Sequence, residues 1–168
     1  MEKSAAIRFV PVRREDRTLL WNLFQKFLYE MTNFYDDEFD AEGNLHYGHF
    51  DSYFAGDPDR KALFLYEEET LVGFIMMNKY SHVGAKLDWA LAEFTVFPRF
   101  RRRHIALRSA KKLLNEYPGA WEIKYNEKNS AAKALWNGLA APFSPQITQL
   151  NVFETVLDFT VPGKKDQD

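Results

Sequence analysis

A run of arginines is the part of this sequence that most directly suggests chemistry. Five arginines lie between Arg99 and Arg108, and no acidic residue occurs from Phe94 to Asn115. The run follows a segment with strand-like alternation and precedes one with helical periodicity, so we place it at a strand-to-helix turn. The first amides of a helix have no intrahelical partner, and the helix dipole favours negative charge there. The charge therefore fits a nucleic acid, a phosphate-bearing small molecule or a solvated helix face.

Acidic residues concentrate in the first half of the chain. Nine acids and no lysine or arginine lie between Phe27 and Asp59, whereas seven basic residues lie between Arg99 and Lys112. A protein that coats nucleic acid carries a basic surface wider than one turn, and its affinity collapses between low and moderate salt. We therefore favour two local sites of opposite sign and expect no nucleic-acid partner.

The composition is that of one folded domain. The chain has 168 residues, of which 46% are hydrophobic, and it contains no cysteine. The lack of cysteine excludes disulfides, cysteine nucleophiles and thiol redox chemistry. We expect a single domain over residues 1–162 and a polar tail over residues 163–168. The first residues lack the apolar core of a signal peptide, and no apolar run approaches the ~18 residues of a membrane span. We therefore expect a cytoplasmic protein without a membrane partner.

Hydrophobic periodicity predicts an α/β (α+β) fold. Hairpin-linked strands indicate a mixed, mostly antiparallel sheet of six to seven strands flanked by about four helices, and the unit from Trp89 to Tyr125 adds one parallel, right-handed β-α-β crossover. Strict alternation along the strand before Pro98 places Leu91 and Glu93 on one face. The predicted strands cover residues 6–12, 62–66, 71–78, 87–97, 118–125 and 146–161, and the predicted helices cover residues 14–31, 49–55, 104–117 and 126–139.

Two segments resemble motifs of one enzyme family. The stretch V-F-P-R-F-R-R-R-H-I-A, from Val96 to Ala106, resembles motif A of the GNAT superfamily of acyl-CoA-dependent N-acyltransferases, V-x-P-x-(Tyr/Phe)-(Arg/Gln)-x-x-Gly-x-(Gly/Ala). The stretch N-S-A-A-K-A-L-W, from Asn129 to Trp136, resembles the following motif, N-x-x-A-x-x-x-Tyr. His104 stands where the family usually has glycine, and Trp136 replaces the usual tyrosine.

The resemblance implies a GNAT-like fold and an N-acetyltransferase that moves acetyl from acetyl-CoA to a primary amine by direct attack in a ternary complex. The alternative is a non-catalytic acyl-CoA-binding module of the same fold. Backbone groups on the strand would hold the pantetheine arm and polarise the thioester, and amides of the turn from Arg101 to Ala106 would hold the pyrophosphate. The implied coenzyme A-binding residues are Phe94, Thr95, Val96, Arg101, Arg102, Arg103, His104, Ile105, Ala106, Asn129 and Trp136. His104 adds a side chain where the backbone must approach the phosphate closely; we expect helical dihedrals there, in which a Cβ is tolerated, so the departure does not exclude binding.

Two residues are candidates for proton transfer. Attack on a thioester requires a neutral amine, so a carboxylate or water must accept its proton. Glu93 lies three residues before Val96 among apolar neighbours that would raise its pKa, although it could instead be a structural carboxylate satisfied by hydrogen bonds. Asp88 is a weaker candidate, because an aspartate at a strand entry is usually a cap. The indole of Trp136 cannot protonate a leaving thiolate, so either another group such as Tyr125 or water does so, or the thiolate leaves unassisted.

The acidic region is the candidate acceptor site. We expect Asp36, Asp37, Glu38 and Asp40 to attract a cationic small-molecule or peptide amine, with Tyr35 and Phe34 as apolar contacts; the alternative is a solvated acidic loop. His46, His49 and Asp51 offer no further ligand set, so we expect no metal cofactor. The sequence contains neither a phosphate-binding P-loop nor a serine nucleophile elbow, and a homodimer is compatible with it.

Overall fold

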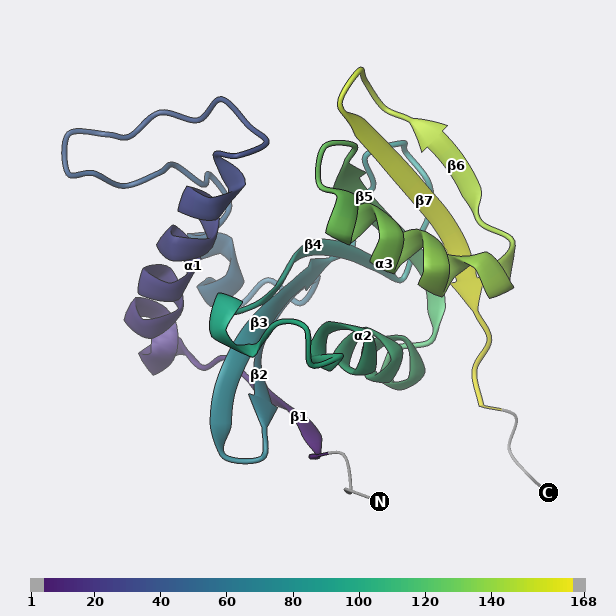
Figure 1. Ribbon diagram of the computed structural model, residues 1–168, viewed down its shortest axis with the longest axis horizontal. Coiled ribbons are helices and arrows are strands. Elements are labelled where there is room, and N and C mark those ends of the chain that lie inside the picture. The colour runs from purple at the N-terminus through teal and green to yellow at the C-terminus, as the bar shows by residue number, and fades with distance from the viewer. Residues whose placement is uncertain (1–4, 165–168) are drawn as a thin grey trace.

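A twisted seven-stranded sheet forms the centre of the computed structural model, which describes residues 5–164 (Figure 1). The strand order is β1-β2-β3-β4-β5-β7-β6, and every neighbouring pair is antiparallel except β4 and β5. The predicted mixed sheet and its single parallel crossover are therefore confirmed. The strands are β1 (Ile7–Pro11), β2 (Arg60–Glu67), β3 (Thr70–Asn78), β4 (Trp89–Val96), β5 (Gly119–Asn126), β6 (Gln146–Gln149) and β7 (Glu154–Val161).

Helices cover both faces of the sheet. Helix α1 (Arg17–Met31) packs on one face, and α2 (Ile105–Glu116) and α3 (Ser130–Ala140) pack on the other. The residues described thus contain three α-helices rather than about four. The segment predicted as a further short helix forms the 3₁₀ turn η2 (Asp51–Phe54), because Gly56 and Pro58 stop it before a full α-helical turn can follow. The other 3₁₀ turns are η1 (Arg14–Asp16), η3 (Pro98–Phe100) and η4 (Ala141–Phe143).

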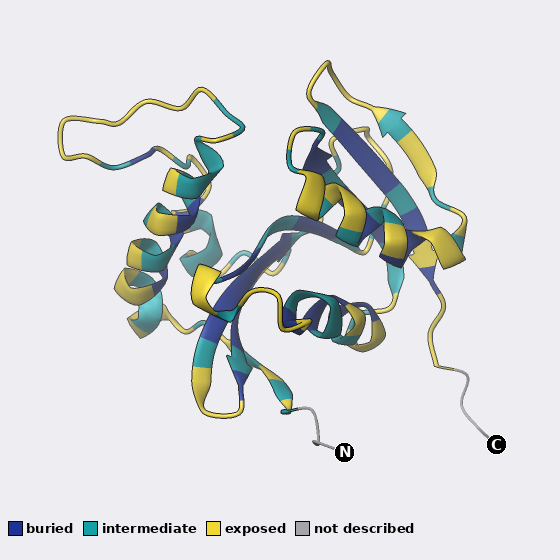
Figure 2. Ribbon diagram, in the orientation of Figure 1, coloured by how far each residue is buried: buried dark blue, intermediate teal, exposed yellow. Residues whose placement is uncertain are grey.

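Three apolar clusters hold the layers together, and the smallest of them contains Val96 of β4 and Ile105 of α2. Leu113, Trp136 and Leu157 belong to the core between the sheet and the helices α2 and α3, and Phe24 and Phe74 belong to the core beneath α1. Figure 2 shows buried residues along the central strands and on the inward sides of the helices. No helix within residues 5–164 combines the length and apolar character needed to cross a bilayer.

A β-bulge interrupts β4 at the position that matters most for the site. Met76 pairs with Glu93 and Met77 pairs with Leu91, so Ala92 is an extra residue on β4. A bulge shifts the alternation of side chains by one position. Accordingly, Leu91 and Phe94 both contact the α2–α3 core, whereas Ala92 packs in the α1 core. The predicted placement of Leu91 and Glu93 on one face is therefore wrong.

The parallel pair β4 and β5 separates early. The two strands pair only from Trp89 to Leu91 on β4 and from Trp121 to Ile123 on β5. Beyond this point β4 keeps its pairing with β3, and β5 keeps its pairing with β7 as far as Asn126. The edge of β4 that faces β5 is therefore open along residues 92–96, next to the turn that leads into α2 (Figure 1).

Candidate functional site

The turn between β4 and α2 has an unusual backbone. After the 3₁₀ turn η3, the amide of Arg101 donates to the carbonyl of Pro98 at 3.3 Å. Arg102 and His104 both adopt left-handed conformations, with φ of 60° and 58°. The expectation of helical dihedrals at His104 is therefore wrong, since His104 is the N-cap that precedes the helix rather than its first residue. This conformation explains why glycine suits the position.

The amides of this turn form the first part of the candidate site. Within residues 5–164, no carbonyl or side chain accepts a hydrogen bond from the amides of residues 102–107. The Arg101 amide, which the sequence placed in this set, is already used by Pro98. Successive unpartnered amides at a helix N-terminus, with left-handed residues among them, make a concave anion-binding surface. The turn therefore suits a phosphate or pyrophosphate group.

Most of the arginine charge is paired across the fold. Arg101 binds Glu30 of α1 and donates from Nε to the carbonyl of Val96 at 2.7 Å. Arg103 and Arg108 both bind Glu67 at the end of β2. Arg99 and Arg102 are exposed and have no ion pair within the part of the chain that the structure describes.

The side of the open β4 edge that faces α3 is aromatic. The ring of Phe94 meets the indole of Trp136 edge-on, with ring centroids 5.3 Å apart. The hydroxyl of Tyr125 accepts a hydrogen bond from Asn137 Nδ2 at 3.0 Å and lies in the same core cluster as Trp136. The side chain of Asn129 caps α3, because its Oδ1 accepts from the amide of Ala132 at 3.1 Å. The structure thus brings Phe94, Tyr125 and Trp136 together beside the open strand edge.

Glu93 lies on the opposite side of β4, toward α1. Desolvation by its surroundings raises the pKa of Glu93 to about 8, although the positive charge of Lys124 and hydrogen bonding with the Tyr47 hydroxyl lower it. The residue as a whole is of intermediate burial. A desolvated carboxyl group that titrates near neutral pH can accept a proton from a substrate and release it again.

Tyrosines surround this carboxyl group. Burial is the main cause of the raised pKa of Tyr35, Tyr47 and Tyr53, and the nearby charge of Glu93 contributes in each case. The Tyr53 hydroxyl is buried and has no hydrogen-bond partner within residues 5–164. Of these tyrosines, the sequence predicted only Tyr35. Lys124, also missed, could have been found from its alternation with the core residues of β5, whereas the loop position of Tyr47 carried no such signal.

The acidic residues of the loop that follows α1 are mostly exposed. The Tyr35 hydroxyl donates to Glu154 at 2.9 Å, and Glu154 also binds Lys124 at 2.6 Å. Tyr35 is therefore joined to the sheet near the candidate base. By contrast, Asp36, Asp37 and Glu38 are exposed loop residues without an ion pair in the described part of the chain. Asp40 accepts hydrogen bonds from the amides of Glu42 and Asn44 and so stabilises its own loop.

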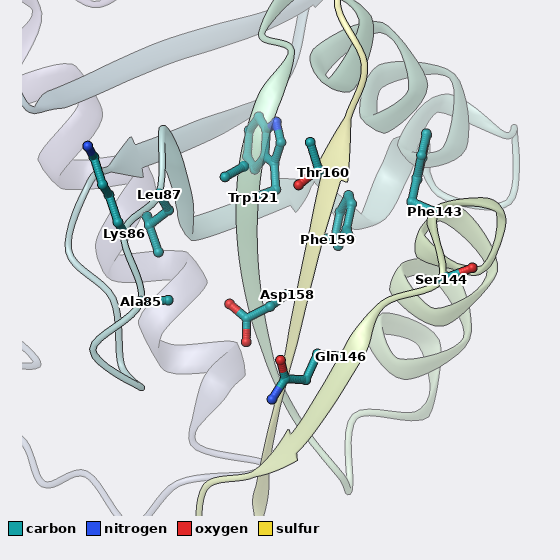
Figure 3. A pocket seen from close by; sticks show the side chains of 11 residues that line it. Ala85, Lys86, Leu87, Trp121, Phe143, Ser144, Gln146, Asp158, Phe159 and Thr160 are labelled. Atoms are coloured by element: carbon teal, nitrogen blue, oxygen red, sulfur yellow. The ribbon is translucent and has the colours of Figure 1, made fainter.

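Other candidates lie outside this arrangement. Asp88 accepts a hydrogen bond from the amide of Ala120 at 2.8 Å and acts as a structural cap. Within residues 5–164, no three histidine, aspartate or glutamate side chains gather as metal ligands. A shallow pocket near Lys86, Gln146 and Asp158 (Figure 3) contains none of the predicted site residues.

Comparison with known proteins identifies the family and the fold. A family model described as the acetyltransferase (GNAT) family matches residues 20–139, so the chain belongs to this family. Among solved structures, an acetyltransferase from Thermus thermophilus has a TM-score of 0.68 at 14% identity, covering 94% of this chain and 99% of that one. No curated protein matches the sequence.

Two further structures share the fold. The ribosomal-protein-S18-alanine N-acetyltransferase of Escherichia coli has a TM-score of 0.61 at 12% identity, covering 97% of this chain and 99% of that one. The diaminobutyrate acetyltransferase EctA of Paenibacillus lautus, in complex with L-2,4-diaminobutyric acid and coenzyme A, has a TM-score of 0.59 at 15% identity, covering 94% and 96%. The fold class predicted from the sequence is confirmed.

Proposed function

We propose that this protein transfers the acetyl group of acetyl-CoA to a primary amine. The observation that carries the proposal is the row of unpartnered amides from residue 102 to residue 107, which lies directly after the open edge of β4. An extended pantetheine arm can pair with such an edge like an added strand, and a pyrophosphate can bind the amides. The coenzyme A in the P. lautus structure supports the same ligand here.

The open edge divides the site into two sides with different chemistry. The backbone of Phe94, Thr95 and Val96 would hold the pantetheine arm, and an amide near Val96 would stabilise the oxyanion. Phe94 and Trp136 form an aromatic wall on the α3 side. Glu93 lies on the α1 side with Tyr47 and Lys124. The acceptor amine would therefore approach from the α1 side and meet the thioester at the open edge.

Proton transfer accompanies the acyl transfer in a balanced step. The amine nitrogen attacks the thioester carbonyl carbon and forms the new C–N bond, and the carboxylate of Glu93 accepts the proton that the nitrogen loses. The C–S bond then breaks, and the departing thiolate takes a proton from the hydroxyl of Tyr125. The hydrogen bond from Asn137 occupies an acceptor position of this hydroxyl and leaves its own proton available for donation.

The acidic loop would act at longer range. Asp36, Asp37 and Glu38 are exposed, so they would attract a cationic acceptor rather than bind it closely. Changing all three residues and Asp40 to amides should raise the KM for an amine substrate, and this increase should shrink as the salt concentration rises. An unchanged KM at low salt would show that the loop is only a solvated surface.

The second candidate is an acyl-CoA-binding protein without catalysis. The buried Trp136, in the place where the family usually has tyrosine, favours this reading because it removes the usual hydroxyl. Calorimetric titration with acetyl-CoA, followed by a screen of amines for thiol release, separates the two functions. Binding with turnover supports the enzyme, binding without turnover on any amine supports the binding protein, and failure to bind contradicts both.

A further inference from the structure

Glu67 joins three segments that are distant in the sequence. Its side chain is only 9% exposed, and its two carboxylate oxygens accept from Arg103 Nη2 at 2.8 Å and from Arg108 Nη2 at 2.6 Å. Arg108 also donates from Nη1 to the carbonyl of Ala5 at 2.5 Å. One buried carboxylate therefore connects the end of β2, the turn of residues 101–104 (the candidate anion-binding turn) and the first turns of α2.

The turn needs such an external anchor. Arg102 and His104 adopt left-handed conformations, each of which costs roughly 1–2 kcal/mol for a residue with a side chain. The amides of residues 102–107 contribute no hydrogen bond to any acceptor within residues 5–164, so the backbone does little to compensate this cost. Strained residues persist where surrounding contacts determine their conformation. Here the contacts come from Arg101 and Arg103, which alternate with the two strained residues.

We propose that Glu67 is a positioning residue that keeps the turn in its anion-binding shape by holding Arg103 and Arg108. Glu67 does not touch the ligand: it fixes the side chains on either side of His104, so that the amides of residues 102–107 stay aligned toward one point. The identification of the anion as the pyrophosphate of coenzyme A rests on the proposed function. The role of Glu67 in holding Arg103 and Arg108 is independent of that function, because it concerns only the conformation of the turn.

Electrostatics makes the proposal sharply testable. Replacing Glu67 with glutamine removes one negative charge beside the anion site, and Coulomb's law alone then predicts tighter anion binding. Loss of a positioning residue predicts the opposite, because the amides are no longer aligned. The two explanations therefore differ in the sign of the effect.

The first experiment measures coenzyme A binding by calorimetry for the wild type, Glu67→Gln, Arg103→Met and the double variant at fixed ionic strength. We expect Glu67→Gln to weaken binding by about ten-fold, which corresponds to about 1.4 kcal/mol. Because both changes release the same contact, Arg103→Met should weaken binding in the wild type and add little in the Glu67→Gln background. The matched control is Glu69→Gln, which makes the same charge change in the same hairpin at a side chain that is 95% exposed.

Two results would overturn the proposal. One is equal or tighter binding by Glu67→Gln. The other is an equal loss from Arg103→Met in both backgrounds, which would mean that Arg103 contacts the phosphate directly. If the wild type does not bind coenzyme A, the proposed function fails, and the holding role is decided by the second experiment.

The second experiment needs no ligand. Trypsin cleaves after exposed arginines, but a turn with a fixed conformation resists cleavage. We expect Glu67→Gln to increase the fraction of molecules in which the turn is locally unfolded. Cleavage after Arg102 should therefore be about ten-fold faster in this variant. Cleavage after Lys86, in an exposed loop, should not change, and Glu69→Gln should behave as the wild type. If Glu67→Gln does not fold, Arg103→Met is the substitute, because its side chain is 54% exposed. Unchanged cleavage after Arg102 would contradict the proposal.

Discussion

Arg101 and Glu30 form a two-point ion pair, with Nη1 2.8 Å from Oε1 and Nη2 3.0 Å from Oε2. Arg101 belongs to the anion-binding turn, and Glu30 is the last residue but one of α1, directly before the loop that carries Tyr35. The pair therefore connects the candidate cofactor side of the protein to the candidate acceptor side. Since Arg101 also donates to the carbonyl of Val96, it fixes the end of the open strand relative to α1.

Breaking this pair at Glu30 should have a small effect on stability. Both side chains are more than 30% exposed, and an ion pair of this kind contributes about 1 kcal/mol or less. We therefore expect Glu30→Gln to lower the melting temperature by roughly 2–4 °C and Arg101→Ala to lower it further, because the bond to Val96 is lost as well. Thermal unfolding followed by circular dichroism tests this, with Glu42→Gln in the exposed loop as the control. A lower melting temperature for Glu30→Gln than for Arg101→Ala would contradict the expectation.

Glu93 should impose a pH dependence on turnover. Because the pKa of Glu93 is about 8 and the base must be ionised, kcat/KM for a given amine should rise with pH and rise less steeply above pH 8, where only deprotonation of the amine still contributes. Glu93→Gln should lower kcat by at least ten-fold and leave the affinity for acetyl-CoA nearly unchanged. The pH profile of the variant then reports the amine alone. If kcat/KM has the same values and the same pH dependence in the wild type and in Glu93→Gln, Glu93 is not the base.

The same pKa affects stability with a defined sign. The pKa of Glu93 lies above the ordinary value of 4.5, so the folded protein holds a proton that the unfolded chain has lost between these two pH values. The resulting stabilisation is complete below pH 4.5 and is lost as the pH rises through 8. The stability of Glu93→Gln relative to the wild type should therefore increase from pH 5 to pH 9. Urea unfolding at these two pH values provides the measurement, and a constant difference would be inconsistent with a raised pKa.

Tyr125 and Trp136 provide a test of thiolate protonation. We expect Tyr125→Phe to lower kcat by at least ten-fold, with little change in the KM for acetyl-CoA. The hydroxyl lies in a buried cluster and is bonded to Asn137, so some loss of stability accompanies the change. Trp136→Tyr would return a hydroxyl to the position where the family usually has one. In the Tyr125→Phe background this second change should restore part of kcat, whereas no loss from Tyr125→Phe would assign the proton to water.

His104 should be replaceable by glycine at little cost. Its left-handed φ of 58° is unfavourable for a residue with a Cβ by roughly 1–2 kcal/mol. Replacement by glycine removes this strain, which offsets the greater conformational entropy of glycine in the unfolded chain. We expect His104→Gly to melt at the same temperature as the wild type or higher, and to bind coenzyme A more tightly because the backbone can approach the phosphates more closely. Ala106→Gly, a change inside α2, should cost about 1 kcal/mol. A similar loss in both variants would show that the left-handed conformation carries no strain.

The order of the elements and the position of the candidate anion-binding turn after β4 could both be predicted from the sequence. These features depend on periodicity, helix-end chemistry and motif spacing, which act over a few residues and can be read along the chain. The GNAT resemblance could be recognised for the same reason, because its two motifs are short segments that cover the turn into α2 and the start of α3.

The pairing of the charges and the direction in which Glu93 faces required the folded chain. Arg101 pairs with an acid 71 residues away, and Arg103 and Arg108 pair with one that is 36 and 41 residues away. The bulge at Ala92 turned Glu93 toward α1, because sheet register depends on the partner strand and not on the alternation of one segment. The arginine run that looked unpaired in the sequence is thus largely a set of structural anchors, and its backbone amides are left as the proposed binding surface.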